Sequence, residues 1–159
     1  MSKDFNKNKV AVLTGAAKKI GRSTATKLAE QGFNILIHTG GKSIEEAKDT
    51  IKLLEKFKIK SNYVTGDLAN LETIHIIKDA ALKLGTPSVL VNNAGLRVHE
   101  HFEKIDYKDW KKVMTVNVDA SFLCAQALIN YMVKQKWGRV INIGGLSAHI
   151  GAKERAHVV

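Results

Sequence analysis

A glycine-rich turn lies between an apolar run and a helical pattern near the start of the chain. Val10 to Leu13 is continuously apolar, Gly15 follows, and the helical pattern begins around Gly21. Glycine permits a sharp turn, and the first N–H groups of a helix lack intrahelical partners and therefore attract an anion. The stretch predicts a binding site for a nucleotide pyrophosphate.

A later helical pattern places an amide and a thiol on one face. Its stripe has helical spacing and consists of Trp110, Val113, Asn117, Ser121, Cys124 and Leu128. Buried polar groups need partners, so Asn117 is either a functional amide or a core asparagine bonded to its surroundings. We interpret Cys124 as a packing residue.

The histidines offer weaker candidates for acid–base or metal chemistry. His149 and His157 could titrate near neutral pH, but we expect both to be exposed loop residues. His99 and His101 could line a substrate pocket, and a His-Glu-His stretch is too short a pattern for a metal site. No metal site is predicted.

The elements that must position these residues alternate along the chain. Strands are expected at 10–13, 33–37, 62–65, 88–91 and 139–143, with four helices between them. The first strand is continuously apolar, which is typical of a strand covered on both faces. Alternating strands and helices with right-handed crossovers predict an α/β fold, a doubly wound parallel sheet of about five strands.

Capping signals set the expected helix boundaries. Ser43 with Glu46 three residues later predicts a capping box, Asn70 caps the next helix, and Asp106 caps a long helix reaching about Gln135. Gly32 closes the first helix, and Gly85 with Pro87 stops the helix that Asn70 begins.

Composition indicates one globular domain, residues 1–159. The chain has a single cysteine, which excludes an intramolecular disulfide and fits a reducing compartment. The lysine-containing start, MSKDFNKNK, has no long apolar segment behind it, so neither a signal peptide nor a transmembrane helix is predicted. We expect a cytoplasmic protein without a membrane partner.

The net charge of +10 is also what a nucleic-acid-binding domain shows. The basic residues, however, are spread along helices; those between Lys48 and Lys60 alternate with Glu45, Glu46, Asp49 and Glu55, as on a solvated helix face. With no aromatic stacking run and no zinc spacing, we predict no nucleic-acid partner.

The last stretch does not read as a natural end of such a sheet. Residues 151–159 begin what reads as another helix, and the fifth strand would be an apolar edge. We expect a fold that is incomplete at its C-terminus or is completed by another chain, and we expect association or poor solubility.

Four motifs in order resemble the N-terminal part of a short-chain dehydrogenase/reductase. They are the turn from Thr14 to Gly21, Asp67-Leu68, Asn92-Asn93-Ala94-Gly95, and Asn117, followed by the strand 138–143. The nearest branches are the oxoacyl-carrier-protein reductase-like and pteridine-reductase-like ones. The resemblance implies a Rossmann-like fold, a nicotinamide cofactor and pairing of subunits through the long helix into a dimer or tetramer.

The resemblance also implies the cofactor-binding residues. The turn that receives the pyrophosphate and adjoining ribose would comprise Gly15, Ala16, Ala17, Lys18, Lys19, Ile20 and Gly21. Asp67 would accept from the adenine amino group, or else be a turn aspartate bonding its own backbone, and Leu68 would line the pocket. Close approach of the cofactor after the fourth strand would involve Asn92, Asn93, Ala94 and Gly95, with one asparagine able to bridge strands.

Two features favour NADP (NADPH) over NAD. Lys19 stands where the family usually has glycine, and a lysine there could contact a cofactor phosphate. After the second strand, where NAD enzymes place an acidic residue on the ribose, the chain reads His38-Thr39-Gly40-Gly41-Lys42-Ser43. No carboxylate repels a 2′-phosphate there, and Lys42 and Ser43 could hold one together with Lys18 or Lys19.

The catalytic set of the family is incomplete. Asn117 would bend its helix and hold a water in the proton relay, but the serine position falls on Gly145, the tyrosine position on Val158, and the lysine position lies beyond Val159. Ser147 could replace the serine in a shifted register. We therefore expect either an NADPH-dependent oxidoreductase reducing a small-molecule carbonyl, such as a 3-oxoacyl group, or a degenerate nucleotide-binding module.

Overall fold

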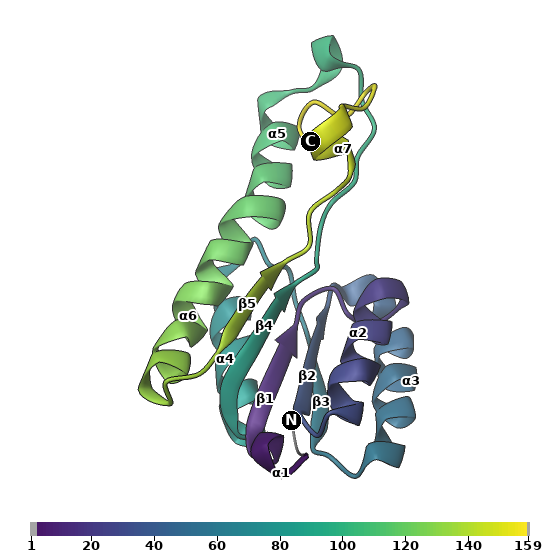
Figure 1. Ribbon diagram of the computed structural model, residues 1–159. Coiled ribbons are helices and arrows are strands. Elements are labelled where there is room, and N and C mark those ends of the chain that lie inside the picture. The colour runs from purple at the N-terminus through teal and green to yellow at the C-terminus, as the bar shows by residue number, and fades with distance from the viewer. Residues whose placement is uncertain (1–2, 159) are drawn as a thin grey trace.

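The computed structural model describes residues 3–158 as a single parallel sheet with helices on both faces (Figure 1). The strand order is β3-β2-β1-β4-β5, and all pairings are parallel. The strands are β1 Lys9–Leu13, β2 Asn34–Thr39, β3 Ser61–Thr65, β4 Thr86–Asn92 and β5 Arg139–Asn142. This is the expected doubly wound α/β fold.

The helices fall into two layers. The longer ones are α2 Lys19–Glu30, α3 Ile44–Leu54, α4 Leu71–Leu84, α5 Tyr107–Met114 and α6 Ala120–Lys134; α1 Lys3–Asn6 and α7 Ser147–Ile150 are short. Helices α2 and α3 cover one face of the sheet, and α4 and α6 cover the other (Figure 1).

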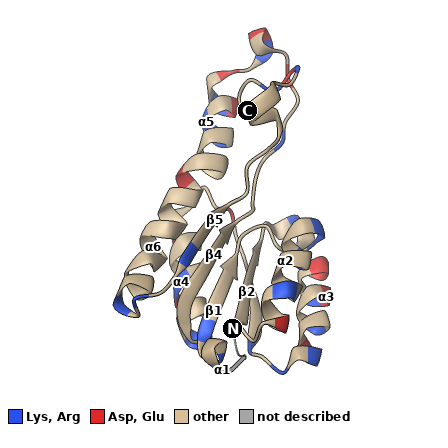
Figure 2. Ribbon diagram, in the orientation of Figure 1, with Lys and Arg blue, Asp and Glu red and all other residues tan. Residues whose placement is uncertain are grey.

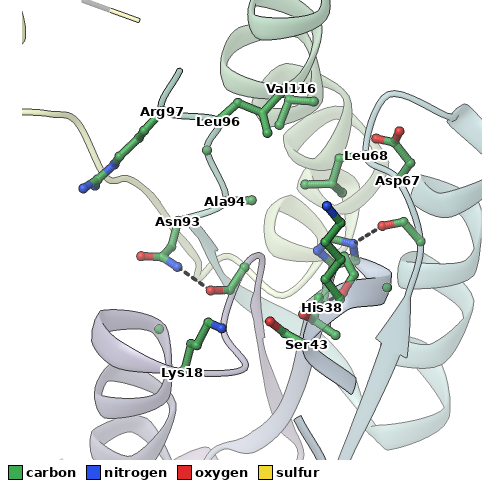
Figure 3. A pocket seen from close by; sticks show the side chains of 18 of the residues that line it. Lys18, His38, Ser43, Asp67, Leu68, Asn93, Ala94, Leu96, Arg97 and Val116 are labelled. Atoms are coloured by element: carbon green, nitrogen blue, oxygen red, sulfur yellow. Dashed lines mark hydrogen bonds between the residues drawn. The ribbon is translucent and has the colours of Figure 1, made fainter. Parts of the chain in front are cut away.

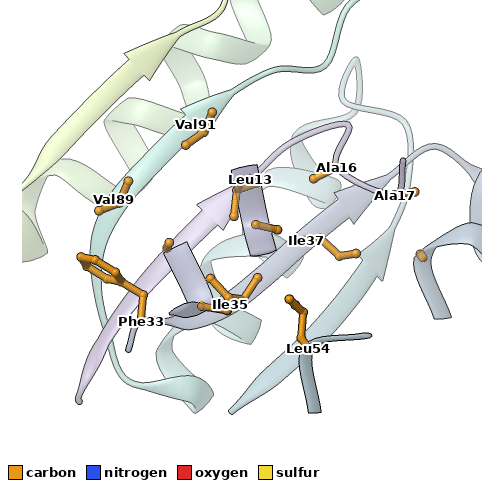
Figure 4. Close-up of a cluster of buried hydrophobic side chains, with 13 residues drawn as sticks. Leu13, Ala16, Ala17, Phe33, Ile35, Ile37, Leu54, Val89 and Val91 are labelled. Atoms are coloured by element: carbon orange, nitrogen blue, oxygen red, sulfur yellow. The ribbon is translucent and has the colours of Figure 1, made fainter. Parts of the chain in front are cut away.

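The alternation of side chains along β1 builds two cores. Ala11 and Leu13 pack with β2, α2 and α3 in the cluster drawn in Figure 4, while Val10 and Val12 pack with α4 and α6 on the opposite face. All four side chains are fully buried. A continuous apolar run is the pattern expected for a strand covered on both faces, and it places the end of β1 at the centre of the molecule.

Two of the three predicted N-caps are confirmed. The side chain of Asn70 accepts from the Glu72 amide and that of Asp106 from the Asp109 amide. The capping box at Ser43 is wrong: residues 41–43 form a 3₁₀ turn, Ser43 makes no side-chain cap, and Glu46 instead pairs with Lys18. A carboxylate three residues after a serine therefore serves a tertiary contact here.

The predicted long helix is continuous but contains a bulge. A π-helical turn, Thr115–Asp119, separates α5 from α6. Trp110, predicted on the buried stripe, is 38% exposed, because the part of the helix before the bulge extends beyond the sheet (Figure 1). A π turn shifts the register of the face that follows it, so one stripe does not describe both halves.

Helix 107–134 is also long and apolar enough to cross a membrane by length and composition alone, with mean hydropathy 1.2, a candidate that the sequence analysis did not identify. Its residues Ala120, Cys124, Leu128 and Met132 are buried in the core beneath β4. This packing is that of a core helix, which passes the same test.

The C-terminal segment differs from expectation. Only Ser147–Ile150 is helical, and residues 151–158 continue without a helix; Val159 lies outside the described residues. The fifth strand is an exposed edge, as predicted: Val140 and Ile141 are 38% and 43% exposed. The sheet therefore presents an apolar edge beside β4.

Candidate cofactor site

A cavity of about 720 Å³ opens at the carboxyl ends of the strands. Strand β2 lies on one side of β1 and β4 lies on the other, so the strand order reverses at β1. The carboxyl ends of the strands beside such a topological switch point are where open α/β sheets bind ligands. The lining residues come from the loops after β1, β2, β3 and β4 and from the end of α5 (Figure 3). They are Gly15, Lys18, Lys19, Ile20, Gly21, His38, Thr39, Gly40, Gly41, Lys42, Ser43, Gly66, Asp67, Leu68, Asn93, Ala94, Gly95, Leu96, Arg97, Lys112 and Val116.

The turn after β1 is close-packed against the loop after β4. Gly15 has a φ of +61°, and a Cβ there would lie 2.7 Å from the Cα of Ala94. A Cβ on Gly21 would lie 2.4 Å from the Cα of Ala16. Glycine is thus required at both positions, and the backbone can approach a ligand closely. This cradle fits a dinucleotide pyrophosphate.

The N-terminus of α2 directs its positive dipole end and its unpaired amides at the glycine turn after β1. Lys18 occupies the N-cap position without a side-chain cap, and the first turn has no acidic residue. The first intrahelical bond shown there runs from the Arg22 amide to the Lys18 carbonyl, so the amides before it have no helical partner. A helix N-terminus in this state favours an anion.

Lys19 adopts a left-handed conformation, with a φ of +51°. The sequence departs here from the glycine usual in the family, and the backbone keeps the conformation that favours glycine. A non-glycine residue in this region costs about 1 kcal/mol. The lysine side chain lines the cavity.

Thr14 and Asn93 tie the two glycine loops together. The hydroxyl of Thr14 accepts from the amides of Asn93 and Ala94, both at 3.1 Å. The amide side chain of Asn93 donates back to the carbonyls of Thr14 and Gly15, at 3.1 and 2.8 Å. These four bonds fix the loop after β4 against the turn after β1. Figure 3 draws one of them, from the side chain of Asn93.

Arg22 is a supporting residue that the sequence analysis missed. Its guanidinium donates to the carbonyls of Ala17 and Glu46 and to the hydroxyl of Thr50. The hydroxyl of Thr50 also donates to the Ala17 carbonyl at 2.8 Å. This network anchors the turn to α3, and nothing in the local pattern around Arg22 distinguishes it from an exposed helix residue.

His38 faces inward rather than toward solvent. It is 2% exposed, its Nε2 lies 3.0 Å from the Gly66 carbonyl, and its own carbonyl accepts from the Ala16 amide. Desolvation lowers the pKa of His38, although the Gly66 carbonyl and the charge of Asp67 oppose the shift. The ring is therefore neutral at pH 7 and joins the loops after β2 and β3.

Asp67 and its neighbours define the other end of the cavity. One oxygen of Asp67 accepts from the Ala69 amide at 3.0 Å, which is the turn role left open by the sequence, while the residue stays exposed and lines the cavity. Leu68 is buried and lines the wall. Lys42 and Ser43 follow β2 and line the cavity, and Ser43 lies near His38 in Figure 3.

Three of the residues predicted to bind the cofactor are not among the described residues that line the cavity. Ala16 and Ala17 are buried beneath the turn, where their small side chains permit its close packing. Asn92 is buried and donates to the side chain of Asn142 at 2.8 Å, so it bridges β4 and β5. Its role is to hold the edge strand.

Asn117 lies in the π turn and fastens the loop after β4. Its oxygen accepts from the Leu96 amide at 2.7 Å and its nitrogen donates to the Leu96 carbonyl at 3.1 Å. The side chain is half-buried. The amide on the helix face therefore has a specific tertiary partner.

The segment after β5 carries the catalytic candidates. Gly145 has no side chain, but the hydroxyl of Ser147 lies 3.4 Å from where a Cβ on Gly145 would be. Among residues 3–158, no protein partner is bonded to that hydroxyl. The hydroxyl of Ser147 is thus close to Gly145, the position that the resemblance aligns with the family's serine, although neither residue lines the cavity.

The histidines are distributed differently from expectation. His149 is exposed as expected, but His157 is 1% exposed and both its ring nitrogens lack a partner within residues 3–158. Outside the cavity, His99 contacts Arg155, and His101 lies 3.2 Å from Glu154. No cluster of metal-ligating side chains is found in the described part of the chain.

Several lining residues were missed by the sequence analysis, notably Arg97, Lys112 and Val116. Arg97 lies two residues after the Asn-Asn-Ala-Gly motif, a signal that could have been used. Lys112 and Val116 are four residues apart on the long helix, but only the fold shows that this helix reaches the cavity.

The comparisons with known proteins agree on one family. The family model for short chain dehydrogenase matches residues 9–157. A 3-oxoacyl-(acyl-carrier-protein) reductase, FabG, of Staphylococcus epidermidis is 33% identical over 158 residues, covering 96% of this chain and 62% of that protein. L-rhamnose 1-dehydrogenase (NADP(+)) of Thermoplasma acidophilum is 35% identical, covering 97% and 61%.

Solved structures show the same similarity. The crystal structure of acetoin dehydrogenase YohF from Salmonella typhimurium superimposes with a TM-score of 0.89 at 33% identity, covering 95% of this chain and 60% of that one. The chain therefore spans about three fifths of the length of the relatives it matches.

Proposed function

Because this chain belongs to the short-chain dehydrogenase/reductase family, we propose that it binds NADPH and serves the reduction of a small carbonyl compound to an alcohol. The observation that carries the proposal is the glycine cradle beside the uncapped N-terminus of α2, at the switch point of the sheet. The bound cofactor supplies the hydride. The chain's residues bind and orient it.

The charge around the cavity supports NADPH over NADH. Lys18 and Lys19 lie on the pyrophosphate turn, Lys42 lies after β2, and the segment Gly40-Gly41-Lys42-Ser43 has no carboxylate. A 2′-phosphate placed after β2 would meet cations instead of the acidic residue that NAD enzymes use. An NADP-linked and an oxoacyl reductase among the relatives are consistent with this preference.

The cofactor preference is tested by measuring dissociation constants for NADPH and NADH. We expect NADPH to bind at least about tenfold more tightly, since hydrogen bonds to charged groups contribute about 1.5–3 kcal/mol each. Lys42→Gln should reduce this ratio. Lys48→Gln is the matched control, because Lys48 lies on α3 and pairs with Glu45 instead of lining the cavity. Equal affinities for both cofactors in the unmodified chain would contradict the NADPH assignment.

On the reduction itself, we propose that Ser147 orients the substrate carbonyl. Its hydroxyl lies near the family's serine position, and it has no protein partner in the described chain. Asn117 holds Leu96 and thereby the loop after β4; in the family this amide also holds a water of the proton relay. With Val158 at the tyrosine position, no tyrosine there supplies the proton, so the proton that completes the alcohol would come from a water molecule.

Oxidation of NADPH by a panel of ketones tests this role. Ser147→Ala should lower kcat by about 10²-fold, the effect of removing one positioned hydrogen-bond donor. His149→Asn, an exposed change on the same short helix, should leave kcat within a factor of about two. Equal rates for the Ser147→Ala variant and the unmodified chain would exclude Ser147.

A second candidate is a cofactor-binding module without catalysis. Gly145 and Val158 favour it, because the hydroxyl groups expected at these two positions are absent. General acid catalysis contributes about 10²–10⁴ in rate, so such a chain would bind far better than it turns over. NADPH binding together with no ketone-dependent NADPH oxidation would identify this module.

For its setting, we propose a cytoplasmic homo-oligomer that binds no nucleic acid. The single cysteine is buried, and burial raises its pKa to about 11, which fits a packing residue. Lys and Arg are spread over several helices and loops in Figure 2, without a stripe along one element. Weak retention on heparin at physiological salt would support the absence of nucleic-acid binding.

A further inference from the structure

We propose that the carbonyl substrate is an anion, and that Arg97 binds its carboxylate or phosphate. The inference rests on the proposed reductase function and specifies the substrate class. It concerns the half of the cavity that the cofactor's phosphates do not require.

The position of Arg97 separates it from the cations of the pyrophosphate turn and of the segment after β2, which are Lys18, Lys19 and Lys42. The pyrophosphate turn lies at the centre of the switch point, and the ribose-recognition segment follows β2, so the second half of a dinucleotide extends over β4 and β5. Arg97 follows β4. In Figure 3 it lies across the cavity from His38, Ser43 and Asp67. It therefore lies at the end where hydride would be transferred.

The charge of Arg97 is uncompensated. Five cations line the cavity: Lys18, Lys19, Lys42, Arg97 and Lys112. Within the described chain, Asp67 is the one carboxylate that lines it. Lys18 pairs with Glu46, and Asp67 lies at the opposite end. Across residues 3–158, no hydrogen bond or ion pair holds the Arg97 guanidinium. Its planar set of donors matches a carboxylate or phosphate in two-point contact.

The cavity that Arg97 lines leaves room for such a ligand beside a bound nucleotide, with a volume of about 720 Å³. The residue before Arg97 is held on both its amide and its carbonyl by Asn117, at 2.7 and 3.1 Å. A fixed backbone reduces the entropy lost when the arginine binds an anion.

The test compares matched anionic and neutral ketones on the full chain loaded with NADP⁺, by titration calorimetry. One pair is acetoacetate and methyl acetoacetate; the other is dihydroxyacetone phosphate and dihydroxyacetone. We expect the anion of at least one pair to bind about tenfold more tightly, or ~1.4 kcal/mol. The pair that shows the difference identifies the anion as carboxylate or phosphate.

Arg97→Gln should abolish this difference between anion and neutral ketone while NADPH binding remains within about twofold. Arg139→Gln is the matched control, because Arg139 is the first residue of β5 and lies at the amino ends of the strands, away from the cavity. This variant should keep the difference between anion and neutral ketone. Thermal unfolding checks that both variants fold.

The outcomes separate this inference from the proposed function. If NADPH binds but neither anion binds more tightly than its neutral partner, the role of Arg97 is overturned and the cofactor assignment stands. The same holds if none of the four ketones binds. If NADPH does not bind, the proposed function fails. The same four titrations without cofactor then decide whether Arg97 selects anions, and no difference again overturns its role.

Discussion

At the residue scale, Lys19 combines backbone strain with a position in the cofactor cavity. Its φ of +51° lies in the left-handed region, and its side chain lines the cavity. A family glycine would remove the strain and also the charge. The lysine therefore lowers the stability of the turn but places a cation at the proposed pyrophosphate site.

We predict that Lys19→Gly raises the free energy of unfolding by about 0.5–1 kcal/mol and weakens NADPH binding several-fold. Lys58→Gly is the control, because Lys58 has a φ of +56° at the end of the turn after α3 and does not line the cavity. The Lys58→Gly variant should gain similar stability and keep its affinity for NADPH. Denaturant unfolding and cofactor titration measure both, and unchanged affinity in Lys19→Gly would remove Lys19 from the binding site.

His38 gives a pH-dependent prediction at the same scale. Its pKa is lowered by burial in the folded chain, whereas the unfolded chain takes up a proton near pH 6.5. The unfolded state thus binds more protons between the folded pKa and 6.5, so stability rises with pH across this window and is fully present above it.

We predict that His38→Asn flattens the pH dependence of the free energy of unfolding below about pH 6.5, where one proton contributes at most about 1.4 kcal/mol per pH unit. His75→Asn, an exposed change on α4, should keep the slope. Urea unfolding at several pH values measures it. A slope unchanged by His38→Asn would show that this ring does not remain neutral on folding.

At the scale of elements, the site depends on bonds between loops that leave different strands. The Thr14 hydroxyl accepts hydrogen bonds from two backbone amides of the loop after β4, and the side chain of Asn117 is hydrogen-bonded to the backbone of Leu96. Parallel strands bring these loops to one edge, but the side-chain bonds fix how closely they approach.

We predict that Thr14→Val lowers the free energy of unfolding by about 2 kcal/mol, because it leaves two amides without their acceptor, and weakens NADPH binding at the adjoining cradle. Thr14→Ser keeps the hydroxyl and should retain most of both properties. Chemical denaturation and calorimetry provide the readouts. A loss as large in Thr14→Ser as in Thr14→Val would contradict the assignment to the hydroxyl, because Thr14→Ser keeps this acceptor.

At the scale of the whole molecule, the outer face of α6 and the adjoining bulge carries four exposed apolar side chains. They are Val118, Phe122, Ile129 and Val133, with exposures from 40% to 66%. The opposite face of α6 packs in the core. Apolar patches of this kind favour association.

We predict that the chain associates in a concentration-dependent manner and that Val133→Glu shifts it toward the monomer. Leu53→Glu, an apolar-to-acidic change at a residue 40% exposed on α3, should not. Sedimentation equilibrium over a range of concentrations compares the three proteins. A monomer at high concentration for the unmodified chain would contradict the expected oligomer.

The sequence by itself determined the order of the strands along the chain, the doubly wound class and the glycine turn after β1. Continuous apolar runs, Asn70 and Asp106 as caps, and glycines at turns are local signals, because they depend on backbone geometry and burial within a few residues. Ser43 with Glu46 gave a false local signal, since Glu46 pairs with Lys18 in α2's N-terminal region.

Only the tertiary structure decided which side chains meet. It turned His38 inward onto Gly66, buried His157, joined Asn117 to Leu96 and placed Arg97 in the cavity wall. These contacts link residues far apart in the chain, and their geometry follows from the lateral order of the strands and from a π turn that shifts one helix face. A periodic pattern carries no information on either.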